Sequence, residues 1–262
     1  MKSSVVRQTV VVTGGASGIG QSVVRQLVRN SGLDIIVLDR NASLGAALVS
    51  RLDTPRLTCA TLDVMDSAGL TVIRDKMIEA GRQIQAVIHS VGSFASTKVL
   101  DASETEWRHS LEMNLDSVFR VSRIFLPTML EQGVGNFVVV ASAFGGRGPV
   151  SGFGVYGVAK AAVISLVREL AAEAAPFGVS VNSVSPGVLA SPLLNAIPDY
   201  DKHADEIGRL FPLTNQVGDP AEIAKWVCSL ATGELGWMTG QDVVVDGGFG
   251  CMPLFELAGI IP

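Results

Sequence analysis

The sequence predicts a doubly wound α/β fold, in which helices cover both faces of one parallel sheet. Short runs rich in Val, Ile and Leu alternate with longer amphipathic segments along the whole chain. Hydrophobic residues make up 48% and charged residues only 17%, and glycine is abundant with 28 residues. Strands buried on both faces of a sheet have this nearly continuous apolar composition. Alternating strands and helices imply right-handed crossovers between parallel strands.

Seven apolar runs are expected to be strands. They are Thr9–Val12, Asp34–Asp39, Leu57–Leu62, Ala86–Ser90, Asn136–Ala141, Val179–Val184 and Asp242–Asp246. The segments between them repeat apolar residues with the helical period, and two long helices are expected near 104–131 and 154–176. Residues 1–262 contain no linker or repeat, which favours one domain. Ligands of such sheets bind beyond the carboxyl ends of the strands.

Charge and composition exclude several function classes. The formal net charge is −5 and no basic cluster stands out, so a nucleic-acid or anionic-membrane partner is not expected. No apolar run is long enough to span a bilayer, and the first residues do not resemble a secretory signal. The cysteines, Cys59, Cys228 and Cys251, are odd in number and far apart, which favours a reduced cytoplasmic protein. The three histidines have no metal-ligand spacing.

A glycine loop follows the first expected strand. It runs TGGASGIG from Thr13 to Gly20. A backbone that turns from strand to helix beside a pyrophosphate needs glycines for close approach, and the helix N-terminus offers unpaired N–H groups. A tight turn without a ligand is the alternative. The candidate cofactor contacts of this loop are Gly14, Ser17, Gly18, Ile19 and Gly20, where the Ser17 hydroxyl can donate to phosphate.

Asp39 favours NAD over NADP. It ends the second strand, 19 residues after Gly20, near the interval expected of a carboxylate that accepts the adenosine ribose hydroxyls. A carboxylate there repels a 2′-phosphate by roughly 4 kcal/mol at 4 Å and an effective dielectric near 20. Arg40 is adjacent and either offsets this repulsion in part or is a solvated turn charge.

Two further loops are expected to contact the adenosine half of the cofactor. Asp63 is placed to accept from the adenine amino group with Val64 beside the ring, or else Asp63 is a helix N-cap. After the fourth strand, the small residues Ser90 and Gly92 are expected near the adenosine ribose.

Tyr156 and Lys160 are the strongest chemical signal. They are four residues apart on an expected helix and therefore share one face. A phenol is a poor base near neutrality because its pKa is about 10. A nearby ammonium group favours the phenolate, as does an oxidised nicotinamide ring, so Lys160 and the cofactor are both expected to lower the pKa of Tyr156. Tyr156 can then exchange a proton with an alcohol or ketone. Ser142 follows the fifth strand and is expected to hydrogen-bond the substrate oxygen, unless it is a turn serine.

Taken together, these residues resemble the short-chain dehydrogenase/reductase family. The resemblance runs from about Thr9 to Gly248 and includes the TGGASGIG loop, Asp39 and the Tyr156/Lys160 pair. Three further motifs match: Met-Asn-Leu around Asn114, Ser185-Pro186-Gly187, and Val245-Asp246-Gly247-Gly248. The resemblance implies a Rossmann fold of about seven strands, an NAD cofactor and a homotetramer packed through the two long helices.

The resemblance also implies the roles of individual residues. It implies a catalytic tetrad of Asn114, Ser142, Tyr156 and Lys160. In this tetrad Lys160 also binds the nicotinamide ribose, and Asn114 holds a water that relays protons to solvent. The segment that cradles the nicotinamide contains Pro186, Gly187, Val188 and Ser191.

The sequence departs from the family pattern in four places. His89-Ser90-Val91-Gly92 stands where the family has Asn-Asn-Ala-Gly, and Ser191 stands where Thr is usual. The interval from Ser142 to Tyr156 is 14 residues, one longer than expected. A tail, Cys251–Pro262, follows the Asp-Gly-Gly segment. None of these departures removes a member of the tetrad.

The substrate is expected to be a neutral secondary alcohol or ketone, since no Arg or Lys cluster suggests an anionic one. Its contacts are expected from Phe144, the loop 148–155 and a lid over about 189–213. The leading interpretation is an NAD-dependent oxidoreductase. A 3-oxoacyl thioester reductase has the same fold and tetrad, but such enzymes usually prefer NADPH. A regulatory NAD-binding protein without turnover is the third possibility, and the intact tetrad speaks against it.

Overall fold

A computed structural model describes residues 7–146, 152–197 and 199–251. Its centre is a seven-stranded sheet in the order β3-β2-β1-β4-β5-β6-β7, and every neighbouring pair is parallel. The strands are β1 (Arg7–Thr13), β2 (Asp34–Asp39), β3 (Leu57–Thr61), β4 (Arg82–His89), β5 (Gly135–Val140), β6 (Val179–Pro186) and β7 (Asp242–Val245). This arrangement confirms the doubly wound parallel sheet that the sequence predicts.

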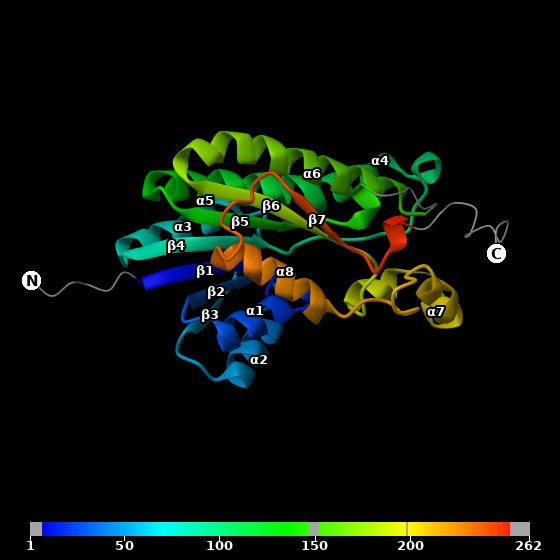
Figure 1. Ribbon diagram of the computed structural model, residues 1–262, viewed down its shortest axis with the longest axis horizontal. Helices are drawn as coiled ribbons and strands as arrows, with labels where there is room; N and C mark the ends of the chain where they lie inside the picture. Colours follow the sequence, from blue (N-terminus) through cyan, green and yellow to red (C-terminus); the bar gives the residue numbers. More distant parts are fainter. Residues whose placement is uncertain (1–6, 147–151, 198, 252–262) are drawn as a thin grey trace, which may run out of the picture.

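Helices cover both faces of the sheet (Figure 1). One face carries α3 (Ser67–Glu79), α4 (Glu104–Leu111), α5 (Ser117–Gln132) and α6 (Gly154–Ala174). The other carries α1 (Gly18–Asn30), α2 (Ala42–Leu52) and α8 (Pro220–Thr232). Each layer encloses its own cluster of buried apolar side chains. The short helix α7 (Tyr200–Arg209) lies apart from both layers, near the carboxyl ends of the strands.

Local sequence signals explain where these elements begin. The central strand β1 contains Val10, Val11 and Val12, which are fully buried between the two layers. Helix α4 begins with a capping box, in which Ser103 and Glu106 satisfy each other's backbone N–H groups. Helix α8 begins with Asp219 as N-cap followed by Pro220, a pair suited to a helix start.

The observed boundaries differ from the expected ones at several elements. Strand β4 begins four residues before Ala86, and β6 continues through Pro186. The long helix expected near 104–131 is divided by a turn of π-helix at Glu112–Asp116. In this turn the side chain of Asn114 binds main-chain groups of Ser93, in the loop after β4. Such π-turns are often found at functional sites.

Two expectations concern parts of the chain that lie outside the described residues. These are the tail beyond Cys251 and residues 148–151 of the loop 148–155. Within the described segments, no helix combines the length and hydrophobicity needed to cross a bilayer. The same segments hold no group of three or more His, Cys, Asp or Glu side chains arranged to bind a metal.

Candidate active site

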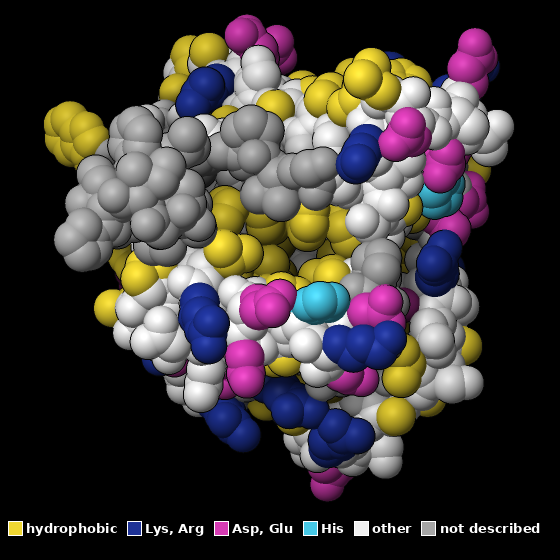
Figure 2. Space-filling model, turned by 90° about the vertical axis from the view of Figure 1, so that its right-hand side faces the viewer, with side chains coloured by type: hydrophobic (Ala, Val, Ile, Leu, Met, Phe, Trp, Pro, Cys, Tyr) yellow, Lys and Arg dark blue, Asp and Glu magenta, His cyan; other side chains and the backbone are white. Residues whose placement is uncertain are grey.

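A cavity opens at the carboxyl ends of the strands. Figure 2 views this edge of the molecule and shows a hollow with hydrophobic side chains at its base. The cavity brings together predicted residues from the loops after β1, β2, β3, β4, β5 and β6 and from helix α6. The predicted contacts that line it are Gly14, Ser17, Gly18, Ile19, Asp39, Arg40, Asp63, Val64, Ser90, Gly92, Ser142, Tyr156, Lys160, Pro186, Gly187, Val188 and Ser191.

The glycine loop at one end of this cavity suits a phosphate group. Gly14 and Gly18 have positive φ angles of 67° and 51°, a region that favours glycine. A Cβ at Gly14 would lie 2.8 Å from the Ser90 carbonyl oxygen, whereas one at Gly18 would project into open space. Helix α1 begins at Gly18, and its N-cap Ser17 is exposed and makes no capping bond with its hydroxyl. The loop therefore leaves amide groups and a hydroxyl for a ligand.

Asp39 braces the glycine loop as well as facing the cavity. Its Oδ2 accepts from the Ala16 N–H at 3.0 Å, and its Oδ1 accepts from the Asn41 N–H at 2.9 Å. These bonds hold the carboxylate in one orientation between β2 and the loop. The sequence predicts the position of Asp39 but not this bracing, since spacing alone does not reveal a contact between two loops.

The structure decides the role of Asp63 in helix capping. The N-cap of α3 is Asp66, whose carboxylate accepts from Gly69 N–H at 3.0 Å. Asp63 instead accepts from Met65 N–H at 2.9 Å and lines the cavity together with Val64. The N-cap alternative for Asp63 is therefore wrong, because the helix starts three residues later than that alternative requires.

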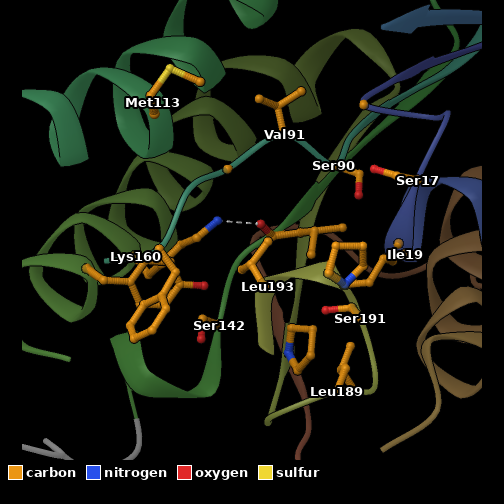
Figure 3. A pocket seen from close by; sticks show the side chains of 18 of the residues that line it. Ser17, Ile19, Ser90, Val91, Met113, Ser142, Lys160, Leu189, Ser191 and Leu193 are labelled. Atoms are coloured by element: carbon orange, nitrogen blue, oxygen red, sulfur yellow. Dashed lines mark hydrogen bonds between the residues drawn. The ribbon is translucent and has the colours of Figure 1, made fainter. Parts of the chain in front are cut away.

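Tyr156, Lys160 and Ser142 meet at the other end of the cavity. Lys160 is 3% exposed, and its Nζ donates to the Val140 carbonyl oxygen at 3.0 Å (Figure 3). The same Nζ lies 5.7 Å from the centre of the Tyr156 ring. Ser142 comes from the turn after β5, is 4% exposed, and interacts with the Tyr156 hydroxyl. A phenol, a hydroxyl and an ammonium group thus share one buried corner.

The fourth predicted tetrad member lies behind the cavity wall. Asn114 is fully buried in the π-turn, and its Nδ2 donates to the carbonyl oxygens of Ser93 and Ser110. Its Oδ1 accepts from Ser93 N–H at 3.2 Å. A Cβ added at Gly92 would lie 2.8 Å from Asn114 Oδ1 and 3.4 Å from Lys160 Nζ. Asn114 therefore anchors the loop after β4, and Gly92 keeps open a small space between it and Lys160.

Burial shifts both titrating groups away from their charged forms. It raises the pKa of Tyr156 to about 12, although the Ser142 hydroxyl acts in the opposite direction. It lowers the pKa of Lys160 to about 8. The lowered pKa expected for Tyr156 is therefore absent in the protein alone, because the loss of solvent favours the neutral phenol. The other expected source of acidity, an oxidised nicotinamide ring, stays a prediction.

A buried histidine network supports this corner, and the predicted site residues did not include it. His89 is fully buried, with Nδ1 2.9 Å from Thr13 Oγ1 and Nε2 3.1 Å from Ser117 Oγ. Ser117 donates its proton to the Met113 carbonyl oxygen, so it accepts from His89 Nε2–H. Burial, followed by the charge of Lys160, lowers the pKa of His89 to about 3. The one signal for it in the sequence was that His89 stands where the family's Asn-Asn-Ala-Gly motif has its first Asn.

The segment after β6 forms the remaining wall. Pro186, Gly187 and Val188 line the cavity where β6 ends, and Ser191 caps the short 3₁₀ turn Pro192–Ala196 without a capping side-chain bond. A Cβ at Gly187 would lie 2.8 Å from the Phe211 ring. The cavity thus combines a glycine loop with free amide groups, a fixed carboxylate and a small-residue wall, which together fit a dinucleotide.

Comparison with known proteins agrees with this geometry. A family model described as enoyl-(acyl carrier protein) reductase matches residues 14–250. The chain belongs to the short-chain dehydrogenase/reductase family. The 2-keto-3-deoxy-L-fuconate dehydrogenase of Xanthomonas campestris pv. campestris is 31% identical over 91% of this chain and 79% of that protein.

Two further relatives of this family are alcohol dehydrogenases. The cyclopentanol dehydrogenase of Comamonas testosteroni is 31% identical over 92% of this chain and 96% of that protein. The NADP-dependent (R)-specific alcohol dehydrogenase of Lentilactobacillus kefiri is 30% identical over 91% and 95%. Among solved structures, a short-chain dehydrogenase/reductase family oxidoreductase from Burkholderia thailandensis superposes with a TM-score of 0.85 at 27% identity, covering 97% of this chain and 98% of that one. The protein is therefore an enzyme of the short-chain oxidoreductase type, with a nicotinamide dinucleotide as its cofactor.

Proposed function

We propose that this short-chain dehydrogenase/reductase interconverts a secondary alcohol and a ketone with NAD as hydride carrier. The observation that carries the proposal is the meeting of Tyr156, Ser142 and Lys160 in the cavity that the glycine loop and Asp39 also line. Because the dinucleotide-binding loop and the proton-transferring groups share one cavity, a substrate oxygen can reach both.

The chain's own residues supply the proton chemistry. When bound, the nicotinamide accepts or donates hydride, and in its oxidised form it adds a positive charge. Ser142 orients the substrate oxygen. Tyr156 takes the proton from the alcohol during oxidation and returns it during reduction. Lys160 favours the phenolate through its charge, whereas burial alone holds the phenol in its neutral form. The space beside Gly92, between Lys160 and Asn114, is the proposed place of a relay water.

Asp39 supports NAD as the cofactor. Its carboxylate is fixed by two backbone N–H groups and faces the cavity, so it cannot turn away from a 2′-phosphate without losing both bonds. Arg40 is exposed and lines the same region. The relative from Lentilactobacillus kefiri is NADP-dependent by name, which makes this carboxylate the feature to test.

The long helices support a homotetramer. Phe119 on α5 and Val158 on α6 are 47% and 43% exposed. Apolar side chains on these outer faces suit packing against a second copy of the chain. Native mass spectrometry that finds only monomer would contradict this part of the proposal.

The test of the reaction is the substitution Tyr156→Phe. It should lower NAD-linked oxidation of a panel of secondary alcohols by about 10²–10⁴-fold, the usual contribution of a general acid–base group. NAD binding should stay within about threefold of the unmodified protein, because the phenol contacts substrate more than adenosine. Tyr200→Phe replaces the only other tyrosine, which lies within 189–213 but is not among the residues that line the cavity, and is the matched control. Equal turnover in the Tyr156 variant and the control would refute the mechanism. Reduction of 3-oxoacyl thioesters with NADPH in preference to any alcohol would favour the alternative reductase.

A further inference from the structure

Three phenylalanine rings stand beside the catalytic phenol. Phe94 and Phe153 have ring centroids 4.6 Å apart with 32° between their planes, and Phe153 and Phe144 are 4.4 Å apart with 30°. Phe94 also meets the Tyr156 ring edge-on, at 5.3 Å and 85°. All four residues line the cavity. We call Phe94, Phe153 and Phe144 the phenylalanine stack.

The phenylalanine stack is assembled from segments far apart in sequence. Phe94 lies in the loop after β4, Phe144 in the turn after β5, and Phe153 directly before α6. The row continues outside the cavity, since Phe144 contacts Phe249 and Phe249 contacts the buried Phe211. Aromatic residues make up only 6% of the chain, so their gathering at one end of one cavity points to a role there rather than to general core packing.

The phenylalanine stack faces an end of the cavity with little charge. Of the described residues that line the cavity, those with charged side chains are Asp39, Arg40, Asp63 and Lys160. Asp39 ends β2, and Arg40 and Asp63 lie in the loops after β2 and β3, at the proposed adenosine end. Lys160 donates to the Val140 carbonyl oxygen. The rest of the substrate end is apolar, and its lining includes Met113, Leu193, Leu194 and Ile197. Ser142 and Tyr156 add the hydroxyls that would hold the reacting oxygen.

We propose that the substrate carries an aromatic ring next to its reacting carbon, and that this ring packs against the phenylalanine stack. The inference rests on the proposed function, because Tyr156 fixes where the reacting oxygen lies. Aromatic rings attract one another in offset or edge-to-face arrangements at centroid distances of 4.5–7 Å, beyond the effect of burial alone. A saturated ring of the same size gains the burial but lacks this attraction.

Two ketones that differ only in their six-membered ring provide the test. Acetophenone carries a flat aromatic ring, and cyclohexyl methyl ketone carries a saturated one. Their binding is measured by titration to the Tyr156→Phe protein, with and without NADH, so that no turnover occurs. Because the saturated ketone is the more hydrophobic of the two, burial alone favours it. We expect acetophenone to bind about 3- to 10-fold more tightly, the range that one or two aromatic contacts supply.

The substitution Phe153→Leu in the same protein removes the central ring of the stack and keeps an apolar side chain. The ratio of the dissociation constant of cyclohexyl methyl ketone to that of acetophenone should then fall to about one or below. Phe177→Leu, at an exposed position on the 3₁₀ turn after α6, is the control and should keep the ratio. Equal or weaker binding of acetophenone in the parent protein, or a preference that survives Phe153→Leu, would overturn the proposal.

Turnover separates this inference from the proposed function. In protein with Tyr156 intact, the kcat/KM ratio of 1-phenylethanol to 1-cyclohexylethanol should fall severalfold on Phe153→Leu, and comparing ratios cancels the intrinsic reactivity of the two alcohols. If neither alcohol nor any other in a broad panel is oxidised while acetophenone still binds preferentially, the reaction is wrong and the aromatic site stands. If other alcohols are oxidised and the ratio does not respond, the reaction stands and the aromatic site is wrong.

Discussion

The side chain of Lys160 donates to the carbonyl oxygen of Val140, 3.0 Å away, at the last residue of strand β5. One hydrogen bond thus joins helix α6 to the central sheet and holds an ammonium group in a corner with 3% exposure. Its pKa is lowered to about 8 by this burial. The group is charged at neutral pH and carries an unfavourable desolvation energy in the folded state.

We expect Lys160→Met to make the protein more stable and less active. A pKa lowered from 10.5 to about 8 corresponds to about 3 kcal/mol of destabilisation wherever the buried group is charged. This loss is fully present below pH 8, and it shrinks as pH rises toward 10.5 because the folded protein releases its proton first. Denaturant unfolding at pH 7 should show a gain of about 1–3 kcal/mol, after loss of the Val140 bond. Turnover should fall at least a hundredfold. The control Lys98→Met, at an exposed position, should change neither stability nor turnover. A loss of stability in the Lys160 variant would contradict this account.

Tyr156 should titrate late in the free protein and earlier with NAD bound. Burial raises its pKa to about 12, so the phenolate is scarce below pH 10 in the absence of ligand. The positive nicotinamide ring is expected to lower this pKa, because an opposite charge favours the anion. Near-ultraviolet absorbance of the Tyr200→Phe protein, in which Tyr156 is the only tyrosine, measures the phenolate directly. An unchanged titration on saturation with NAD would rule out this source of the acidity.

Asp39→Ser should abolish the preference for NAD over NADP. Removing a fixed carboxylate removes roughly 4 kcal/mol of repulsion against a 2′-phosphate, or less if water enters. The ratio of the dissociation constant of NADP to that of NAD should therefore fall about a hundredfold. Asp63→Ser provides the comparison, because its carboxylate also lines the cavity and the adenine is common to both cofactors. Asp63→Ser should weaken the binding of NAD and NADP equally. A shifted ratio in this variant would contradict the assignment of the discrimination to Asp39.

His89 should make the protein sensitive to acid. Its folded pKa is lowered from 6.5 to about 3, so between these values the unfolded chain binds a proton that the folded protein does not. Stability is therefore unaffected above pH 6.5 and is lost as pH falls, by about 3 kcal/mol at pH 4. The free energy of unfolding is measured with denaturant between pH 7 and pH 4. Its slope against pH should be smaller in His89→Asn than in the parent protein. His109→Asn, at an exposed site, should leave the slope as in the parent protein.

The sequence predicted the fold and many of the residues that line the cavity, because both depend on local patterns. Gly20 and Asn114, which were also expected at the site, are not among the lining residues. Apolar runs define strands such as Asp34–Asp39 at their observed bounds, and glycine spacing follows from the turn that Gly14 and Gly18 must make. What it missed depends on contacts between distant segments. The bracing of Ala16 by Asp39 and the break of the long helix at Asn114 are of this kind. The pKa of Tyr156 was misjudged for a related reason, since spacing reveals a charged neighbour but not the loss of solvent around it.

The strand order has a consequence for how the enzyme matures. The glycine loop, Asp39 and Asp63 come from the segments up to β3, whereas Ser142, Tyr156 and Lys160 come from those after β4. In the described sheet the two sets of strands join only where β1 pairs with β4. These two strands are separated by about 70 residues of chain. Closing so long a loop costs conformational entropy, so we expect the two strands to pair late in folding. The two halves of the cavity lining therefore face each other only after this pairing has formed. A chain that ends before β4 is expected to lack the cavity.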